Sequence, residues 1–157
     1  MQISIAVNHE TRAVELEGNE TLLDLLRERL GLTGAKRVCD LGECGQCTVL
    51  LDGAPANACI LLAASCRDCE VETIEGLDSQ GSLNPLQRRL AESGGLACGF
   101  CAPAWVMALQ RLFEAQPDAG EAAIRAAAAG VTCRCDPGAI RMAAALLTSV
   151  GTRGSPA

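Results

Sequence analysis

The stretch Cys39-Asp-Leu-Gly-Glu-Cys44-Gly-Gln-Cys47-Thr-Val49 decides how this sequence of 157 residues is interpreted. Its three cysteines follow the spacing C-x4-C-x2-C, and a fourth, Cys59, comes after eleven further residues. One loop with three thiolates and a more distant fourth is typical of plant-type [2Fe–2S] ligation. Zinc sites favour two pairs of the form C-x2-4-C, and a five-residue step with glycine on both sides of the middle cysteine fits that arrangement poorly. We therefore predict that Cys39, Cys44, Cys47 and Cys59 hold one [2Fe–2S] cluster.

The loop is also rich in glycine, with Gly42 and Gly45 on either side of Cys44. Glycine adopts positive φ easily and lets backbone N–H groups come close to a ligand. A cluster held by four thiolates is anionic, so N–H groups aimed at its sulfurs stabilise it and raise its potential. The residue types of the loop thus support the prediction made from the spacing.

A second group of four cysteines lies in the other half of the chain. It consists of a C-x2-C pair, Cys98 and Cys101, and a C-x-C pair, Cys133 and Cys135. Each pair comes just before an expected helix, and helix N-termini favour anions. Zinc is a serious alternative for this group by itself, but beside the first group a second [2Fe–2S] cluster is the better interpretation.

Two further cysteines, Cys66 and Cys69, also spell C-x2-C. A third metal site would need partner ligands that the sequence does not offer, so we interpret Cys66 as a buried small thiol and Cys69 as a chance neighbour.

The one histidine, His9, falls in an expected turn, so we expect it to be exposed. A single exposed histidine makes histidine-based catalysis or Rieske ligation an unsuitable interpretation of this chain. Trp105 and its apolar neighbours are expected to pack in a core; these neighbours are Phe100, Met107 and Phe113.

The pattern of apolar residues changes near residue 80. Before it, alternating runs predict a small mixed sheet with one helix. The expected strands are Gln2–Val7, Arg12–Glu17, Thr48–Leu51 and Val71–Ile74, with a hairpin turn at residues 8–11 and a helix over Thr21–Leu30. After it, helices are expected over 83–92, 103–115, 121–129 and 137–150, with a connection at 78–82 and a tail at 151–157. Pro103 and Pro137 would stand at helix N1 positions, where proline is tolerated.

Composition restricts the class of protein. The formal net charge of −6 argues against nucleic-acid binding, which needs a basic face. Apolar residues make up 49% of the chain but aromatic residues only 2%, so a core of small side chains is expected to gain stability from bound metal. We see no leader peptide and no membrane-spanning run, which favours the cytoplasm, where clustered cysteines are more often metal ligands than disulfides.

Several motifs together resemble the iron–sulfur subunits of the molybdenum hydroxylases, the group that includes xanthine dehydrogenase, aldehyde oxidoreductase and carbon monoxide dehydrogenase. The resemblance covers residues 1 to about 150 and includes all eight predicted ligands. It rests on Thr21–Arg27, Leu30–Lys36, Cys39–Val49, Thr73–Leu77, Cys98–Pro103 and Cys133–Cys135.

The resemblance implies an α+β chain with a β-grasp ferredoxin-like domain at residues 1–77 and a four-helix domain at 83–150. It also implies a heteromeric complex, in which a large partner subunit binds a molybdopterin cofactor and the substrate. This chain would carry electrons through two [2Fe–2S] clusters to FAD on a medium subunit or to another acceptor, with no catalytic residue of its own. The cluster of the helical domain would lie nearer the molybdenum.

Some positions depart from the family pattern. Ala97 stands where a glutamine usually reaches the pterin, Val38 where glycine is usual, and Val131 where asparagine is usual. Asp136-Pro-Gly138 replaces a Thr-Gly-Tyr-like run. These changes affect the expected contact with the cofactor and leave the eight ligands in place.

Two alternative functions remain, a free-standing two-cluster ferredoxin and a zinc-stabilised interaction module. The substrate is not encoded in this chain.

Overall fold

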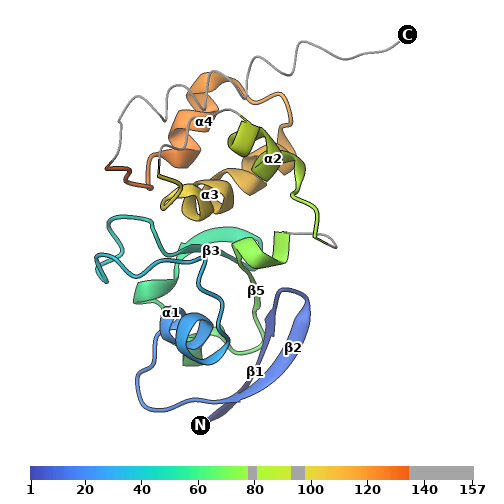
Figure 1. Cartoon of the computed structure of the whole chain (residues 1–157). Helices are drawn as coiled ribbons and strands as arrows, with labels where there is room; N and C mark the ends of the chain where they lie inside the picture. Colours follow the sequence, from blue (N-terminus) through green and yellow to red (C-terminus); the bar gives the residue numbers. More distant parts are fainter. Residues whose placement is uncertain (78–80, 93–97, 135–157) are drawn as a thin grey trace.

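In the computed structural model the residues described are 1–77, 81–92 and 98–134. A five-stranded sheet with one short helix forms the first half, and three helices lie over its far end (Figure 1). This arrangement confirms the expected α+β ferredoxin-like architecture. The fourth helix, expected at 137–150, and the tail at 151–157 lie outside the described residues, as does part of the connection at 78–82.

The sheet has the strand order β2-β1-β5-β3-β4 and is mixed. Its only parallel pair among the described residues is β1 with β5; the other neighbours are antiparallel. The strands are β1 (Gln2–Val7), β2 (Glu10–Glu15), β5 (Glu70–Glu72), β3 (Thr48–Leu51) and β4 (Ala54–Asn57). The strands β1 and β3 were predicted with the right bounds, whereas β2 begins two residues earlier than expected and β5 ends two residues earlier.

The turn between β1 and β2 explains the shifted start of β2. Asn8 and His9 both have positive φ, 52° and 67°. Two such residues form the tight primed turn that matches the twist of a hairpin, so β2 resumes directly after them. His9 is exposed as predicted, and its Nδ1 lies 3.2 Å from Glu70 Oε1.

The helix of the first half lies within one residue of its predicted bounds at each end but is less regular than expected. It comprises α1 (Leu22–Asp24) and a π-helical turn, Leu25–Arg29. Thr21 caps it: its hydroxyl accepts from the Asp24 backbone N–H at 3.1 Å, and the Asp24 carboxylate accepts from the Thr21 backbone N–H at 2.9 Å. This capping box fixes the start of the helix. Its leucines then pack with the inward residues of β1 in a first core, which includes Ile3, Ile5, Leu22, Leu23, Leu25, Leu26 and Val49.

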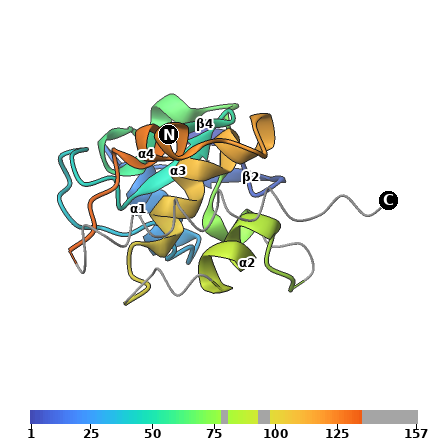
Figure 2. The same ribbon diagram turned by 90° about the horizontal axis from the view of Figure 1, so that it is seen from above.

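The second half contains α2 (Pro85–Glu92), α3 (Ala102–Ala115) and α4 (Glu121–Ala128), each within two residues of its predicted bounds. Figures 1 and 2 show that α3 lies against the part of the sheet formed by β3 and β4, and α3 contacts both strands. The helices enclose a second core, which includes Leu86, Leu90, Trp105, Met107, Leu109 and Ile124. Within the described part of the chain, no helix is long and apolar enough to cross a bilayer.

Strand β3 joins the two cores. Successive side chains of a strand point to opposite faces, so Val49 enters the first core and Leu50 enters the second. Leu77, which follows β5, also packs in the second core. The helical half is therefore packed directly on the sheet.

Candidate metal centres

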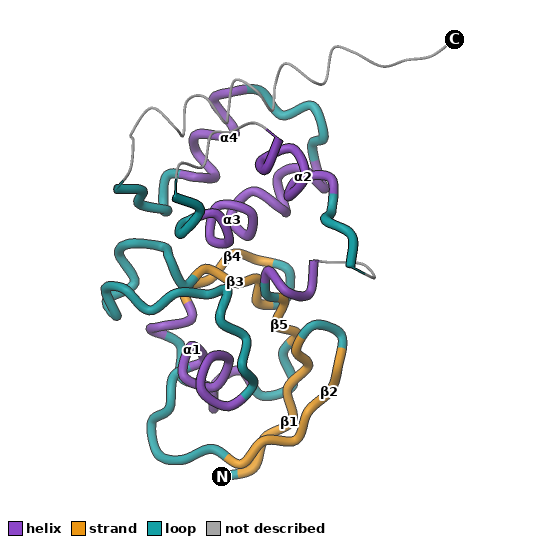
Figure 3. The backbone as a smooth tube through the Cα atoms, in the orientation of Figure 1, coloured by secondary structure: helices purple, strands orange, loops and turns teal. Residues whose placement is uncertain are grey.

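The first group of cysteines lies on a long loop and on the hairpin that follows it. Residues 31–47 contain no helix or strand, as the tube in Figure 3 shows, and they carry Cys39, Cys44 and Cys47. The β3–β4 hairpin pairs Thr48 with Asn57, so it returns the chain to the same end of the sheet. Cys59 therefore comes beside Cys47, and Ala58 N–H donates to the Cys47 carbonyl at 3.2 Å.

Backbone N–H groups of this loop do point at sulfur, as the glycine content predicts. Leu41 N–H donates to Cys39 Sγ at 3.4 Å. This bond, with smaller contributions from Cys44 and Glu43, lowers the pKa of the Cys39 thiol to about 6. Gly42 and Gly45 hold positive φ values of 75° and 67°. The loop thus favours a thiolate at Cys39.

The four thiols of the first group meet in pairs. The Cys44 side chain lies close enough to Cys39 to help lower the pKa of the Cys39 thiol, and Cys59 lies close enough to Cys47 to help raise the pKa of the Cys47 thiol. Burial is the main cause that raises the pKa of Cys47 to about 12. A binuclear cluster takes two thiolates on each iron, and its positive irons offset the cost of an anion at Cys47. The donor set and its pairing therefore fit a [2Fe–2S] cluster. Among the described residues, no three Cys, His, Asp or Glu side chains are arranged to hold a single metal ion.

In the second group the structure brings Cys98, Cys101 and Cys133 together, while Cys135 lies outside the described residues. Cys101 is buried at the N-cap of α3, and Pro103 stands in the first turn of that helix, as predicted. Burial raises the pKa of Cys101 to about 12, and its thiol is hydrogen bonded to Cys133. The three thiols again form a soft donor set, which suits an iron–sulfur cluster as well as zinc.

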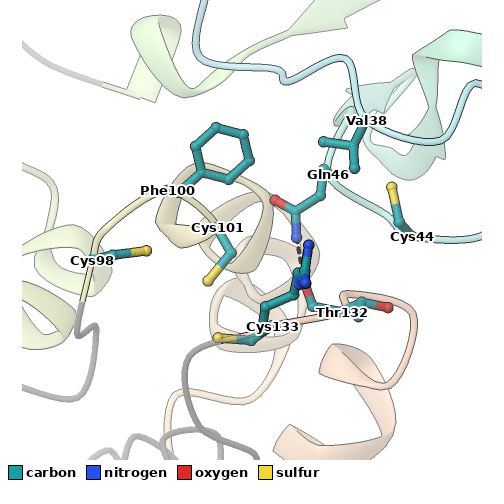
Figure 4. Close-up of a pocket in the computed structure, with 9 residues that line it drawn as sticks. Val38, Cys44, Gln46, Cys98, Phe100, Cys101, Thr132 and Cys133 are labelled. Atoms are coloured by element: carbon teal, nitrogen blue, oxygen red, sulfur yellow. Dashed lines mark hydrogen bonds between the residues drawn. The ribbon is translucent and has the colours of Figure 1, made fainter.

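Cys44 of the first group and Cys98, Cys101 and Cys133 of the second line one cavity of about 290 Å³. In Figure 4, Cys44 approaches this cavity from the first half of the chain, and the thiols of Cys98, Cys101 and Cys133 from the second. The residues that complete its lining are Val38, Gln46, Phe100, Thr132 and Arg134. The two predicted ligand sets are thus neighbours in space.

The segment before Cys133 is hydrogen bonded to the first ligand loop. Thr132 N–H donates to the Cys44 carbonyl at 2.9 Å, and the Gln46 side-chain amide donates to the Thr132 carbonyl. Sequence reasoning did not find these contacts, because nothing in the pattern relates residues 86 positions apart. The one sequence feature that could have indicated such a contact was the position of Gln46 between the two predicted ligands Cys44 and Cys47.

The prediction that Phe100 lies in the core was wrong. Its side chain is 51% exposed, and the ring centroid lies 5.9 Å from Lys36 Nζ, close enough for a cation–π contact. Trp105 and Met107 are buried as predicted, and Phe113 packs partly buried against the same core. Phe100 instead lines the cavity between the cysteine groups.

Two of the positions that depart from the family pattern lie near these centres. Val38 is 55% exposed at the cavity, and Val131 is buried in the second core. Ala97 and residues 136–138 lie outside the described residues.

The remaining cysteines occupy the first core and its margin. Cys66 is buried, as predicted, and burial raises the pKa of its thiol to about 11. Cys69 is half-buried, and its N–H donates to the Cys66 carbonyl at 3.2 Å.

Comparison with known proteins agrees with a division of the chain into two halves that each carry one group of cysteines. Residues 5–63 match the 2Fe-2S iron-sulfur cluster binding domain, and residues 73–145 match the [2Fe-2S] binding domain. The small FeS subunit of nicotinate dehydrogenase from Eubacterium barkeri is 38% identical over 148 residues, which are 94% of each chain. The small subunit of nicotine 6-hydroxylase from Paenarthrobacter nicotinovorans is 39% identical over 86% of this chain and 81% of its own.

Solved structures show the same relationship. A chain of quinoline 2-oxidoreductase from Pseudomonas putida 86 superposes with a TM-score of 0.86 at 34% identity, over 98% of this chain and 97% of that one. Aldehyde oxidoreductase from Desulfovibrio gigas superposes with a TM-score of 0.84 at 31% identity, but this chain covers only 18% of that longer chain. From the two domain matches, the full-length relatives and these superpositions, we conclude that the chain belongs to the molybdenum hydroxylases as an iron–sulfur small subunit of a molybdenum-dependent oxidoreductase.

Proposed function

We propose that the chain holds two [2Fe–2S] clusters and passes electrons between partner subunits. Cys39, Cys44, Cys47 and Cys59 would hold the first cluster, and Cys98, Cys101, Cys133 and Cys135 the second. The pairing of the thiols, the N–H group aimed at Cys39 Sγ and the matched domains support this assignment. When bound, such a cluster takes up and releases one electron at a time.

The observation that carries the proposal is the cavity shared by the two ligand sets. From Cys44 a single hydrogen bond, Thr132 N–H to the Cys44 carbonyl, leads to the residue that precedes Cys133. One hydrogen bond and a few covalent bonds therefore connect a ligand of each group. This chain would thus hold its two redox centres close together.

The partners follow from the relatives, whose names describe them as small subunits of dehydrogenases and hydroxylases. We propose a large partner subunit that carries the molybdopterin cofactor and the substrate, and a FAD-binding subunit or another acceptor that takes the electrons. Residues 1–77 and 83–150 would form the ferredoxin-like and the helical domain, the latter with four helices. No substrate site is proposed on this chain.

The direct test of cluster content is chemical analysis of the purified protein with electron paramagnetic resonance (EPR). We expect about four irons and four acid-labile sulfides per chain, and two distinct signals in the reduced protein. A colourless protein that contains zinc would contradict the proposal.

Ligand assignment is tested by Cys44→Ala, with Cys69→Ser as the control. The first variant should lose one EPR signal and about half of the iron, because two irons lose a ligand set, while the control should keep both signals. Full iron and both signals in the Cys44→Ala protein would show that the first ligand set is wrong.

A further inference from the structure

Gln46 connects the two halves of the chain through its side chain. It stands between Cys44 and Cys47, and its backbone carbonyl accepts from Lys36 N–H at 2.9 Å. Its side-chain Nε2 donates to the carbonyl of Thr132, the residue before Cys133. Figure 4 shows this amide between the ligand loop and the Thr132–Cys133 segment. One side chain therefore spans the gap between the two cysteine groups.

The other end of the same amide has no partner among the described residues. Gln46 is only 4% exposed, and no group in the described part of the chain donates to its Oε1, although Gln46 lines the shared cavity. An unpaired buried polar atom costs about 1–3 kcal/mol relative to a paired one. An apolar side chain of the same size would avoid that cost. Stability alone therefore does not account for a glutamine at this position, and such local conflicts are typical of functional sites.

The Thr132 peptide group is held from both sides by the first ligand loop. Its N–H donates to the Cys44 carbonyl at 2.9 Å, and the carbonyl of the same residue accepts from Gln46. Thr132 is itself exposed, so its own surroundings do not fix it. The two bonds together set how closely Cys133 approaches Cys44.

We propose that Gln46 is a positioning residue that holds the Thr132–Cys133 segment against the first ligand loop and thereby sets the electronic coupling between the two redox centres. This inference rests on the proposed function, since it presupposes a centre on each side of the cavity. Without the amide, the segment keeps one of its two attachments and its distance from Cys44 is free to increase. Electron exchange slows steeply as such a gap widens.

The test compares Gln46→Met with Gln116→Met in the complete, iron-loaded protein. Methionine has nearly the volume of glutamine but cannot donate to Thr132, and Gln116 is an exposed residue at the end of α3. We expect Gln46→Met to weaken the magnetic interaction between the two reduced centres in EPR and to slow electron exchange between them several-fold after flash reduction. Its melting temperature should stay the same or rise, and the control should change none of these quantities.

An unchanged magnetic interaction and exchange rate in Gln46→Met would overturn the inference, as would a lower melting temperature with no change in coupling. Hydrogen exchange of the Thr132 N–H gives a second readout that does not depend on the metal: it should become faster in Gln46→Met, and an unchanged rate would also overturn the inference. If Gln46→Met does not load both centres, Gln46→Ser is measured in its place, with the same expectations for the magnetic interaction, the exchange rate and the hydrogen exchange of Thr132; its melting temperature should fall because serine leaves a cavity. Failure of the proposed function would be visible separately, as a missing signal in the unsubstituted protein.

Discussion

At the scale of single residues, Gly45 shows how closely the two halves approach. Its φ is 67°, and a Cβ at this position would collide with the carbonyl oxygen of Gly130. Gly45 lies between Cys44 and Gln46, the two residues that are hydrogen bonded to Thr132. The two loops thus meet backbone to backbone, and glycine is the residue that permits it.

We therefore expect Gly45→Ala to destabilise the protein by more than the cost of a left-handed alanine alone, which is about 1–2 kcal/mol. The additional loss of stability arises because the alanine Cβ would push the Gly130 carbonyl away and so separate the loop of Gly45 from the loop of Gly130. Gly18→Ala is the matched control, because Gly18 has a φ of 60° and open space around it. Thermal unfolding of both variants measures the difference, and equal losses of stability would contradict the close approach.

The charge on Asp24 provides a prediction about pH. Its pKa is lowered from the ordinary value of 3.8, first by the hydrogen bond from the Thr21 hydroxyl and also by Arg37. A carboxylate with a lowered pKa in the folded state stabilises the fold above pH 3.8, and that contribution is lost as the pH falls through the folded pKa.

Asp24→Asn should therefore lower the melting temperature at pH 7 by a few degrees, which corresponds to about 1 kcal/mol of capping energy. The difference from the unsubstituted protein should shrink as the pH falls below 3.8. Melting temperatures between pH 3 and pH 7 measure this trend, and Asp118→Asn, at an exposed position, serves as the control. A difference that does not depend on pH would show that the carboxylate charge is not responsible.

At the scale of elements, regular patterns were predictable and local exceptions were not. Alternation predicted β1 and β3, the helical pattern predicted α2, and the same pattern with Pro103 predicted α3. Strand β4 was missed because it contains Pro55, which cannot donate to a ladder; it is tolerated because β4 is an edge strand. The helix over Thr21–Leu30 was predicted to within one residue at each end, but its π-helical turn was not, because such a turn leaves no distinct apolar pattern.

The candidate site was likewise predictable in its local sequence patterns and unpredictable in its long-range contacts. Cysteine spacing predicted both candidate ligand groups, since neighbouring ligands of one loop are close in sequence. The cavity between the groups depends on the packing of α3 against β3, which no local pattern encodes. Gln46, Thr132 and Phe100 could therefore be recognised only in the structure.

Strand β3 allows a test of the coupling between elements. Leu50 belongs to the first half of the chain but is 2% exposed in the core of the second. Leu50→Ala should cost about 2–5 kcal/mol, the usual range for a buried leucine. The single tryptophan, Trp105, lies in that same core, so its fluorescence should report the loss. Leu51→Ala, at a half-buried position, should lower the unfolding midpoint less, and the reverse order would contradict the assignment of Leu50 to the helical core.

At the scale of the whole molecule, apolar side chains remain uncovered around the first ligand loop. Val38, Leu41 and Ile60 are 55%, 69% and 58% exposed. Neighbouring exposed apolar side chains are typical of surfaces that contact another protein. They agree with the proposal that this chain acts within a larger assembly.

We expect the natively expressed protein to elute in size-exclusion chromatography far above the 16.3 kDa of one chain, together with molybdenum. The complex should persist at high salt, because apolar contacts are not screened. Elution as a single chain with both clusters would instead favour a free-standing ferredoxin.

The burial of Cys47 and Cys59 has a consequence for biogenesis. Their exposures are 2% and 7%, and both residues lie in the first core among the leucines of the helix. A scaffold protein that delivers a preassembled cluster cannot reach these sulfurs once that core has closed. If these sulfurs hold the proposed first cluster, its maturation would occur on a nascent or locally opened ferredoxin-like half, and late delivery to the fully folded chain would require that half to open again.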